Sequence, residues 1–75
     1  MPTTAAQLSP GQAAFIADIT CIPLSNRLYD MGISPGCTLE LLSIAPCGDP
    51  RVFLTPACVI ALRQCDCRCI LISCL

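Results

Sequence analysis

The sequence contains no histidine, no lysine and no tryptophan, and only 12% of its 75 residues are charged. Histidine is the usual general base and the commonest metal ligand in proteins. Its absence excludes Ser-His-Asp and Cys-His nucleophile systems within this chain. The acidic residues are scattered one to a segment, and the sequence has no glycine-rich phosphate loop. We therefore expect a protein that is not an enzyme.

Positive charge is also scarce, because four arginines stand against five acidic residues for a net charge of −1. Proteins that bind nucleic acids neutralise phosphates with clustered lysines and arginines. A similar cluster attracts proteins to anionic lipids. Four scattered arginines form neither pattern, so we expect no nucleic-acid partner.

Long hydrophobic runs and export signals are lacking as well. The longest nearly apolar stretch, Val52 to Leu62, is interrupted by Thr55 and Pro56 and is too short to cross a bilayer. Residues 1–12 contain no basic residue and no apolar core, which does not fit a signal peptide. The expected location is the cytoplasm, without direct insertion into the membrane.

Apolar side chains, in contrast, are abundant: hydrophobic residues make up 55% of the chain and the mean hydropathy is +0.73. A chain of 75 residues forms one domain, which we place at 1–75, with residues 1–8 loosely ordered. A core of this size cannot hide so much apolar surface. The surplus predicts burial against a partner, a second copy of the chain or a membrane.

Cysteine is the other excess, with eight in the chain. The missing export signal and the many Ile, Leu and Val residues favour reduced thiols over a disulfide-stapled mini-protein. In an extended strand Cys65, Cys67 and Cys69 would point the same way, with Cys74 as a fourth thiolate for Zn²⁺ or Fe²⁺. The spacing is poor for structural zinc, and free cysteine also fills cores as a small hydrophobe. Cys47, at a loop tip, is the thiol most expected to be exposed.

Apolar alternation predicts short strands over most of the chain, at residues 13–19, 37–44, 51–55, 58–63 and 68–73. The phase slips at Leu41 and Leu42, which predicts a β-bulge after which Leu42 and Ile44 carry the apolar side. Residues 64–67 are expected to form a short turn between the last two strands.

Residues 22–31 form the one predicted helix. Leu24, Leu28 and Met31 recur at helical spacing as one apolar stripe, and Gly32 fits the C-terminal cap. So short a helix is not stable alone in water, so its stripe must dock on the open end of a sheet. Five short strands and one helix indicate a mainly β fold, a small barrel.

Several segments together resemble a known family. Residues 28–36 form a leucine-led helix end followed by a small loop with Pro-Gly. Residues 45–50 read Ala-Pro-Cys-Gly-Asp-Pro, and residues 60–63 read Ile-Ala-Leu-Arg. In order and spacing, over about residues 8–72, they are similar to the FeoA family, the ferrous iron transport protein A group.

The resemblance implies an SH3-like β-barrel of about five strands with one short α-helix. It also implies a cytoplasmic accessory protein of ferrous iron uptake, which needs no cofactor of its own. Its partner would be the membrane ferrous iron transporter with a cytosolic GTP-binding domain (FeoB type), through which the protein would associate with the inner membrane. The sequence departs from the family pattern in its cysteines and at Pro56, since proline cannot donate to a strand ladder.

Three residues are candidate contacts for such a partner: Arg27, Tyr29 and Asp49. Instead of contacting a partner, Arg27 could form an ion pair with Asp30, three residues further along the same helix. Asp49 also has a structural alternative, in which its carboxylate bonds nearby backbone N–H groups of its turn. The rival function is a metal-binding or metal-sensing protein that holds Fe²⁺ or Zn²⁺ through the cysteines between residues 65 and 74.

Overall fold

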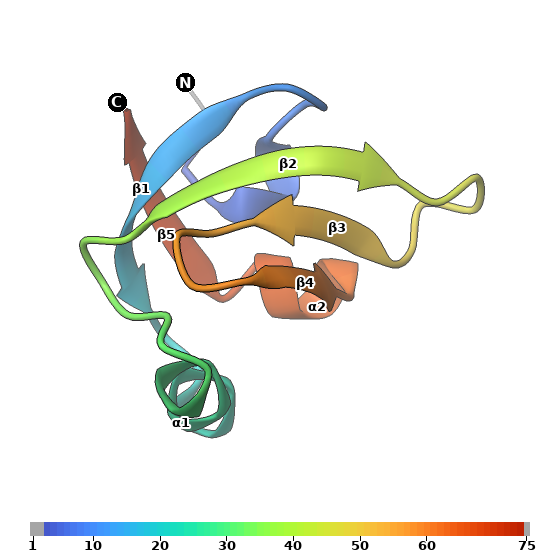
Figure 1. The fold of residues 1–75 in the computed structure, drawn as a ribbon. Coiled ribbons are helices and arrows are strands. Elements are labelled where there is room, and N and C mark those ends of the chain that lie inside the picture. Colours follow the sequence, from blue (N-terminus) through green and yellow to red (C-terminus); the bar gives the residue numbers. More distant parts are fainter. Residues whose placement is uncertain (1–2, 75) are drawn as a thin grey trace.

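The computed structural model describes residues 3–74, apart from the side chain of Cys74, and shows a small barrel of antiparallel strands (Figure 1). The strands are β1 (Ala13–Ile19), β2 (Thr38–Ile44), β3 (Arg51–Leu54), β4 (Val59–Leu62) and β5 (Ile70–Cys74). They form one five-stranded sheet in the order β4-β3-β2-β1-β5. The helices are η1 (Ala5–Gln7), α1 (Ile22–Asp30) and α2 (Gln64–Cys67). The prediction of a mainly β fold with one short α-helix, α1, is confirmed, since η1 and α2 are each about a single turn long.

Helix α1 ends where the sequence predicts, because Gly32 takes a positive φ of 84°. The N–H of Ile33 donates to the carbonyl of Leu28 at 2.8 Å, and the N–H of Gly32 donates to the carbonyl of Tyr29 at 3.0 Å. This pair of bonds is a Schellman motif, which satisfies carbonyls that the helix end would leave free. The motif turns the chain sharply toward β2.

The apolar stripe of α1 is shorter than expected. Leu24 and Leu28 are buried, but Met31 is 42% exposed. The assignment of Met31 to the core was wrong, because the helix ends at Asp30 and Met31 already belongs to the cap. Met31 instead faces a surface groove described below.

The predicted bulge in β2 is confirmed by a register shift between Leu41 and Ser43 opposite β3. Leu42 is the extra residue, and it is 41% exposed. The expectation that Leu42 would lie on the apolar side was therefore wrong, because an unpaired bulge residue need not follow the alternation of its strand. Ile44, two residues further, is half-buried against the core.

Pro56, where the sequence departs from the family pattern, does not disturb the ladder, because it lies between β3 and β4 and in neither strand. Strand β3 ends at Leu54, and a tight turn follows in which the N–H of Thr55 donates to the carbonyl of Cys58 at 2.9 Å. The Thr55 hydroxyl accepts a further bond from the N–H of Cys58 at 3.1 Å. Pro56 lies at the tip of this turn, so all four residue pairs between β3 and β4 form.

Two further segments differ from the sequence expectations. Residues 64–67, expected as a turn, form the one-turn helix α2. Residues 3–8, part of the segment expected to be loose, contain η1 and bury Ala5 and Leu8 in the core. The N–H of Ile72 donates to the carbonyl of Thr3 at 3.1 Å, which attaches this segment to β5. Met1 and Pro2 lie outside the described residues.

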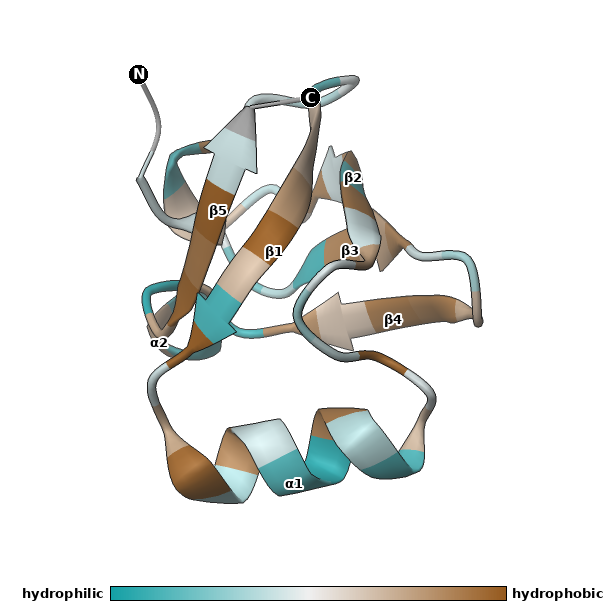
Figure 2. Cartoon of the chain, turned by 90° about the vertical axis from the view of Figure 1, so that its left-hand side faces the viewer, coloured by the Kyte–Doolittle hydropathy of each residue, from teal (hydrophilic) through white to brown (hydrophobic). Residues whose placement is uncertain are grey.

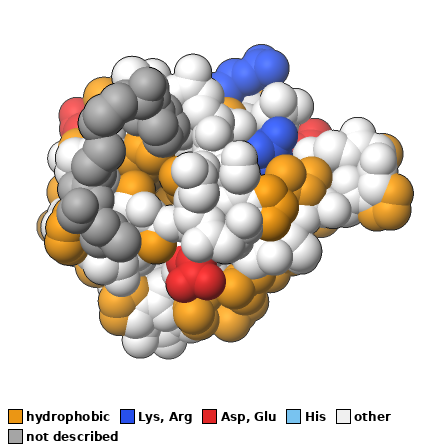
Figure 3. Space-filling view, turned by 90° about the horizontal axis from the view of Figure 1, so that it is seen from above, with side chains coloured by type: hydrophobic (Ala, Val, Ile, Leu, Met, Phe, Trp, Pro, Cys, Tyr) orange, Lys and Arg blue, Asp and Glu red, His pale blue; other side chains and the backbone are white. Residues whose placement is uncertain are grey.

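The core fills the barrel between the sheet and the helices. Its largest fully buried side chains are Phe53, Ile16, Leu28, Ile33, Leu39, Leu41, Ile70 and Cys67. Large hydrophobic side chains also remain exposed, at Phe15, Ile22, Tyr29, Met31, Leu42, Leu54, Val59 and Leu71. Figure 3 shows separate patches of hydrophobic side chains on one face of the molecule, with polar surface and some charged side chains between them. Within the described chain, no helix has the length and apolar character needed to cross a bilayer.

Candidate functional site: a groove beside strand β4

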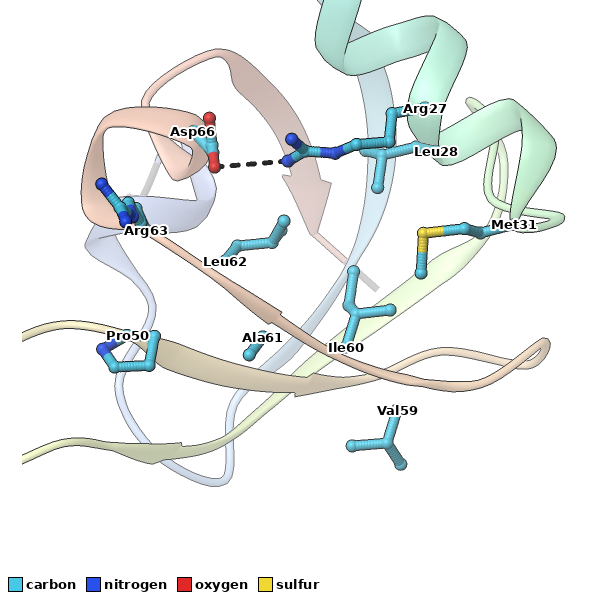
Figure 4. A pocket seen from close by; sticks show the side chains of 10 residues that line it. All are labelled: Arg27, Leu28, Met31, Pro50, Val59, Ile60, Ala61, Leu62, Arg63 and Asp66. Atoms are coloured by element: carbon cyan, nitrogen blue, oxygen red, sulfur yellow. Dashed lines mark hydrogen bonds and ion pairs between the residues drawn. The ribbon is translucent and has the colours of Figure 1, made fainter.

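A groove of about 550 Å³ lies between α1, β4 and α2 (Figure 4). Its lining comprises Arg27, Leu28 and Met31 of α1 and its cap, Val59, Ile60, Ala61 and Leu62 of β4, and Pro50, Arg63 and Asp66 nearby. The centre is therefore apolar, and the charged side chains stand toward one end. Grooves of this size with a few placed polar groups are typical binding sites.

Strand alternation and the helix stripe produce this lining. Ile60 and Leu62 point inward and are almost fully buried, whereas Val59 and Ala61 are exposed. Leu28 reaches toward β4 from the helix, and Met31 follows from the helix cap (Figure 4). Figure 2 shows α1 lying below β4, across the open end of the barrel.

An ion pair bridges the charged end of the groove. A guanidinium nitrogen of Arg27 lies 3.5 Å from a carboxylate oxygen of Asp66, which joins α1 to α2. Asp66 takes the place of the expected partner Asp30. The Arg27 side chain is 61% exposed, so solvent screens the pair and its contribution to stability is small, about 0 to 1 kcal/mol. Arg63, exposed at the same end, makes no side-chain hydrogen bond or ion pair with any other residue in the described range.

The other two candidate contacts lie outside the groove. Tyr29 is 65% exposed on α1 and does not line the groove. A carboxylate oxygen of Asp49 accepts a hydrogen bond from the backbone N–H of Gln64 at 2.7 Å. The sequence suggested a structural role for Asp49, in which its carboxylate bonds backbone N–H groups of its own turn. Asp49 does bond a backbone N–H, but that N–H belongs to α2 and not to its own turn.

The cysteines of residues 65–69 do not face one way, because this segment is helical rather than extended. Cys65 is exposed, Cys67 is fully buried and Cys69 is half-buried, with its sulfur 3.6 Å from the carbonyl oxygen of Cys65. The expectation of a common direction was therefore wrong. In residues 3–74 as described, no three metal-ligating side chains gather closely enough to hold an ion. The side chain of Cys74 lies outside this description.

Burial also changes the chemistry of Cys67. Desolvation raises the pKa of its thiol to about 11, although the positive charge of Arg51 acts in the opposite direction. Since metal binding and nucleophilic attack both use the thiolate, burial and the raised pKa make this thiol less available for either. Cys67 is thus a core residue. Cys47 is exposed as predicted, and its thiol donates to the carbonyl oxygen of Asp49 at 3.0 Å.

The sequence identified only part of the groove. Arg27 was a candidate from the start, but Arg63 and the exposed positions of β4 were not. No local pattern marks them, because the groove joins residues 27–31 to residues 59–66, more than twenty-five positions apart. An arginine directly after an apolar strand was the one available signal.

Fold and groove together define a small SH3-like barrel domain. The FeoA domain model matches residues 3–74, so the chain belongs to the FeoA family. This family is related to ferrous iron transport and consists generally of non-catalytic accessory proteins. No curated protein matches the chain.

Solved structures show the same fold. The FeoA protein of Chlorobium tepidum is 25% identical, with a TM-score of 0.90 over 96% of this chain and 70% of that one. The iron(II) transport protein A of Clostridium thermocellum is 30% identical, with a TM-score of 0.87 over 96% of this chain but only 45% of that one. The zinc complex of Stenotrophomonas maltophilia FeoA, described as a prokaryotic SH3 domain protein, is 17% identical and has a TM-score of 0.81 over 96% of this chain and 91% of that one.

Proposed function

We propose that this protein is a cytoplasmic accessory protein of ferrous iron uptake. It binds the cytosolic part of a membrane iron transporter that carries a GTP-binding domain (FeoB type), and it modulates that transporter. One observation carries the proposal: a FeoA-family barrel holds an open groove with an apolar centre and a charged end. The protein would be held at the inner membrane through this partner.

The make-up of the groove suits a protein partner. Met31 and Val59, the exposed large apolar side chains of the groove, supply affinity when a partner removes them from water, at roughly 25 cal/mol per Å² of apolar surface. The charged end orients the partner, because complementary charges favour one arrangement and penalise others. Arg27, Arg63 and Asp66 are the residues that would do so here.

Modulation follows from selective binding. A protein without a catalytic group can alter a transporter only by binding one of its conformations more tightly than another. In this proposal the barrel stabilises the conformation of the cytosolic domain whose surface fits the groove. The ratio of the two affinities then sets the upper limit of the modulation.

The test is an anaerobic titration of the purified protein with the cytosolic GTP-binding part of the transporter from the same source. We expect binding that Arg27→Gln or Met31→Ser weakens by about tenfold or more, which is about 1.4 kcal/mol. Arg68→Gln is the matched control, because Arg68 is also exposed but does not line the groove. If no complex forms with this domain or with the intact transporter in membranes, the proposal is wrong.

The same titration decides the remaining predictions from the sequence. Tyr29→Ala weakens binding only if the interface extends beyond the groove onto the exposed side of α1. Asp49→Asn keeps the hydrogen-bond acceptor for α2 and removes only the charge, so it measures a direct contact with the partner. Metal analysis of the anaerobically purified protein tests the rival function: a fixed stoichiometry of Fe²⁺ or Zn²⁺ would favour the cysteines.

A further inference from the structure

Strand β4 is an edge of the sheet, since it pairs with β3 and with no other strand in the described chain. The hydrogen-bonding phase of the pair follows from the turn that joins them. The N–H of Thr55 donates to the carbonyl of Cys58, so these two residues form a hydrogen-bonded pair. In an antiparallel ladder such pairs alternate with pairs that are not bonded to each other.

Counting along the ladder from this turn assigns each residue of β4. Ile60 and Leu62 are bonded to their β3 partners, Phe53 and Arg51. Val59 and Ala61 lie between them, so their N–H and C=O groups point away from β3. Both residues line the groove. The groove is therefore bordered by backbone donors and acceptors as well as by apolar side chains.

Apart from its short length of four residues, this edge lacks the devices that usually protect an exposed strand. Proteins protect edges with lysine, proline, inward charges or bulges. The sequence of β4 is Val-Ile-Ala-Leu, without charge or proline, and its register against β3 is regular. Helix α1 lies across the groove from this edge rather than on it (Figure 4). An unprotected edge beside a groove is the arrangement in which β-strand addition occurs.

Charge indicates what the added segment carries. Arg63 follows β4 directly, is exposed and has no ion-pair partner among the residues described. Asp66, the nearby acid of the groove, is already paired with Arg27. Asp49 bonds the backbone N–H of Gln64 nearby but does not line the groove, so within the described range Arg63 is the unpaired charged side chain of the lining, and a carboxylate complements it.

We propose that an extended segment of the transporter partner adds to β4 as a further strand, bonded to the backbone of Val59 and Ala61. An apolar side chain of that segment lies against Met31, and an Asp or Glu of the segment pairs with Arg63. The inference rests on the proposed function and specifies how its groove is used. The backbone bonds provide affinity, and the apolar contacts and the carboxylate provide specificity.

The decisive measurement is amide hydrogen exchange, read residue by residue by NMR, with and without the cytosolic GTP-binding part of the transporter. We expect the amides of Val59 and Ala61 to exchange at least tenfold more slowly in the complex. The amides of Ile60 and Leu62 are already bonded to β3, so they change less. This alternating response is specific for an added strand, since docking by side chains alone does not produce it.

A pair of variants at one position gives an independent test. Ala61→Pro removes the N–H that faces the groove but no bond of the β3–β4 ladder, and proline is tolerated on edge strands. We expect it to weaken the complex by tenfold or more, whereas Ala61→Ser, which keeps the N–H, binds within about twofold of the natural protein. Arg63→Gln weakens binding severalfold, and Arg68→Gln does not.

The outcomes separate the two proposals. A complex that forms without protection of Val59 and Ala61 overturns strand addition and leaves the accessory function standing. Equal binding by Ala61→Pro and Ala61→Ser has the same meaning. If Ala61→Pro does not fold, amide exchange in the natural sequence decides alone. Absence of any complex overturns both proposals, and protection that rises with the protein's own concentration assigns the edge to a second copy of the chain instead.

Discussion

A carboxylate oxygen of Asp49 lies 2.7 Å from the backbone nitrogen of Gln64 and accepts its hydrogen bond. This contact ties the loop between β2 and β3 to the first residue of α2. Arg63, the N-cap residue of α2, provides no side-chain bond to the helix. Since the first N–H groups of a helix have no partner within it, Asp49 does from a distant loop what an N-cap side chain does locally.

Removal of this acceptor should destabilise the fold. We expect Asp49→Ala to lower the free energy of unfolding by about 1 kcal/mol, the usual cost of losing a helix cap. Asp49→Asn keeps an oxygen at the same place and should cost only a few tenths of that amount. Urea denaturation midpoints measure both. Equal losses for Ala and Asn would show that the charge of Asp49, and not its hydrogen bond, stabilises α2.

A side chain at Gly32 should destabilise the fold. Its φ of 84° is unfavourable for other residues, and a Cβ atom there would lie 3.2 Å from the Cβ of Ala57. We expect Gly32→Ala to cost about 1 to 2 kcal/mol for the backbone alone, and more for the contact. Gly48→Ala is the matched control, because Gly48 has a φ of 93° with nothing within 4 Å. A thermal denaturation series in which Gly48→Ala costs as much as Gly32→Ala would rule out a role for the Ala57 contact.

The two ends of the α1 stripe should respond differently to truncation. Leu28 is buried, so Leu28→Ala should destabilise the protein by about 2 to 5 kcal/mol through lost burial and a cavity. Met31 is exposed in the groove, so Met31→Ala should change stability by less than about 1 kcal/mol. Chemical denaturation compares the two directly. A large loss at Met31 would mean that this side chain belongs to the core after all.

Cys67 should make stability fall at high pH. Burial raises the pKa of its thiol to about 11 in the folded protein, against about 9 in the unfolded chain. Between these two values the folded state keeps a proton that the unfolded state loses. Cys67 therefore has no effect on the pH dependence below pH 9, and stability declines from pH 9 to 11 by at most about 1.4 kcal/mol per pH unit.

Two variants isolate this effect. Cys67→Ala removes the buried thiol and should make the decline between pH 9 and 11 less steep, even though it lowers stability overall by leaving a small cavity. Cys47→Ala removes an exposed thiol that does not act on Cys67, and it should leave the slope unchanged. Urea denaturation at several pH values measures the slopes. A slope in Cys67→Ala as steep as that of the natural protein would show that other groups cause the decline.

Much of the fold could be predicted because it depends on local chemistry. Strand alternation, the helical spacing of Leu24 and Leu28 and the cap at Gly32 all lie within a few residues of one another. The errors have local causes as well. Met31 continues the spacing of the apolar stripe, but the helix ends one residue before it. The phase slip indicated a bulge in β2, but it did not show that Leu42 would be the extra, exposed residue.

The candidate site was less accessible to prediction. Arg27 was identified, but its partner was expected three residues away and lies instead on α2, thirty-nine positions along the chain. The cysteines between residues 65 and 69 were read as part of an extended strand, although one helical turn there sends their side chains in different directions. A segment of four residues is too short for periodicity to distinguish a helical turn from other conformations.

The sequence by itself determined the class of the fold, the places where most strands and the longer helix begin and end, and the family, because hydrophobic period, turn residues and short motifs act over short distances. Tertiary structure decided which residues border the groove, which partner each charge meets, and which thiol is buried. These properties depend on how strands and helices distant in sequence pack together. The free edge of β4 is the clearest case, since its bonding phase follows from the turn at Thr55 and Cys58, and its exposure follows from the position of α1.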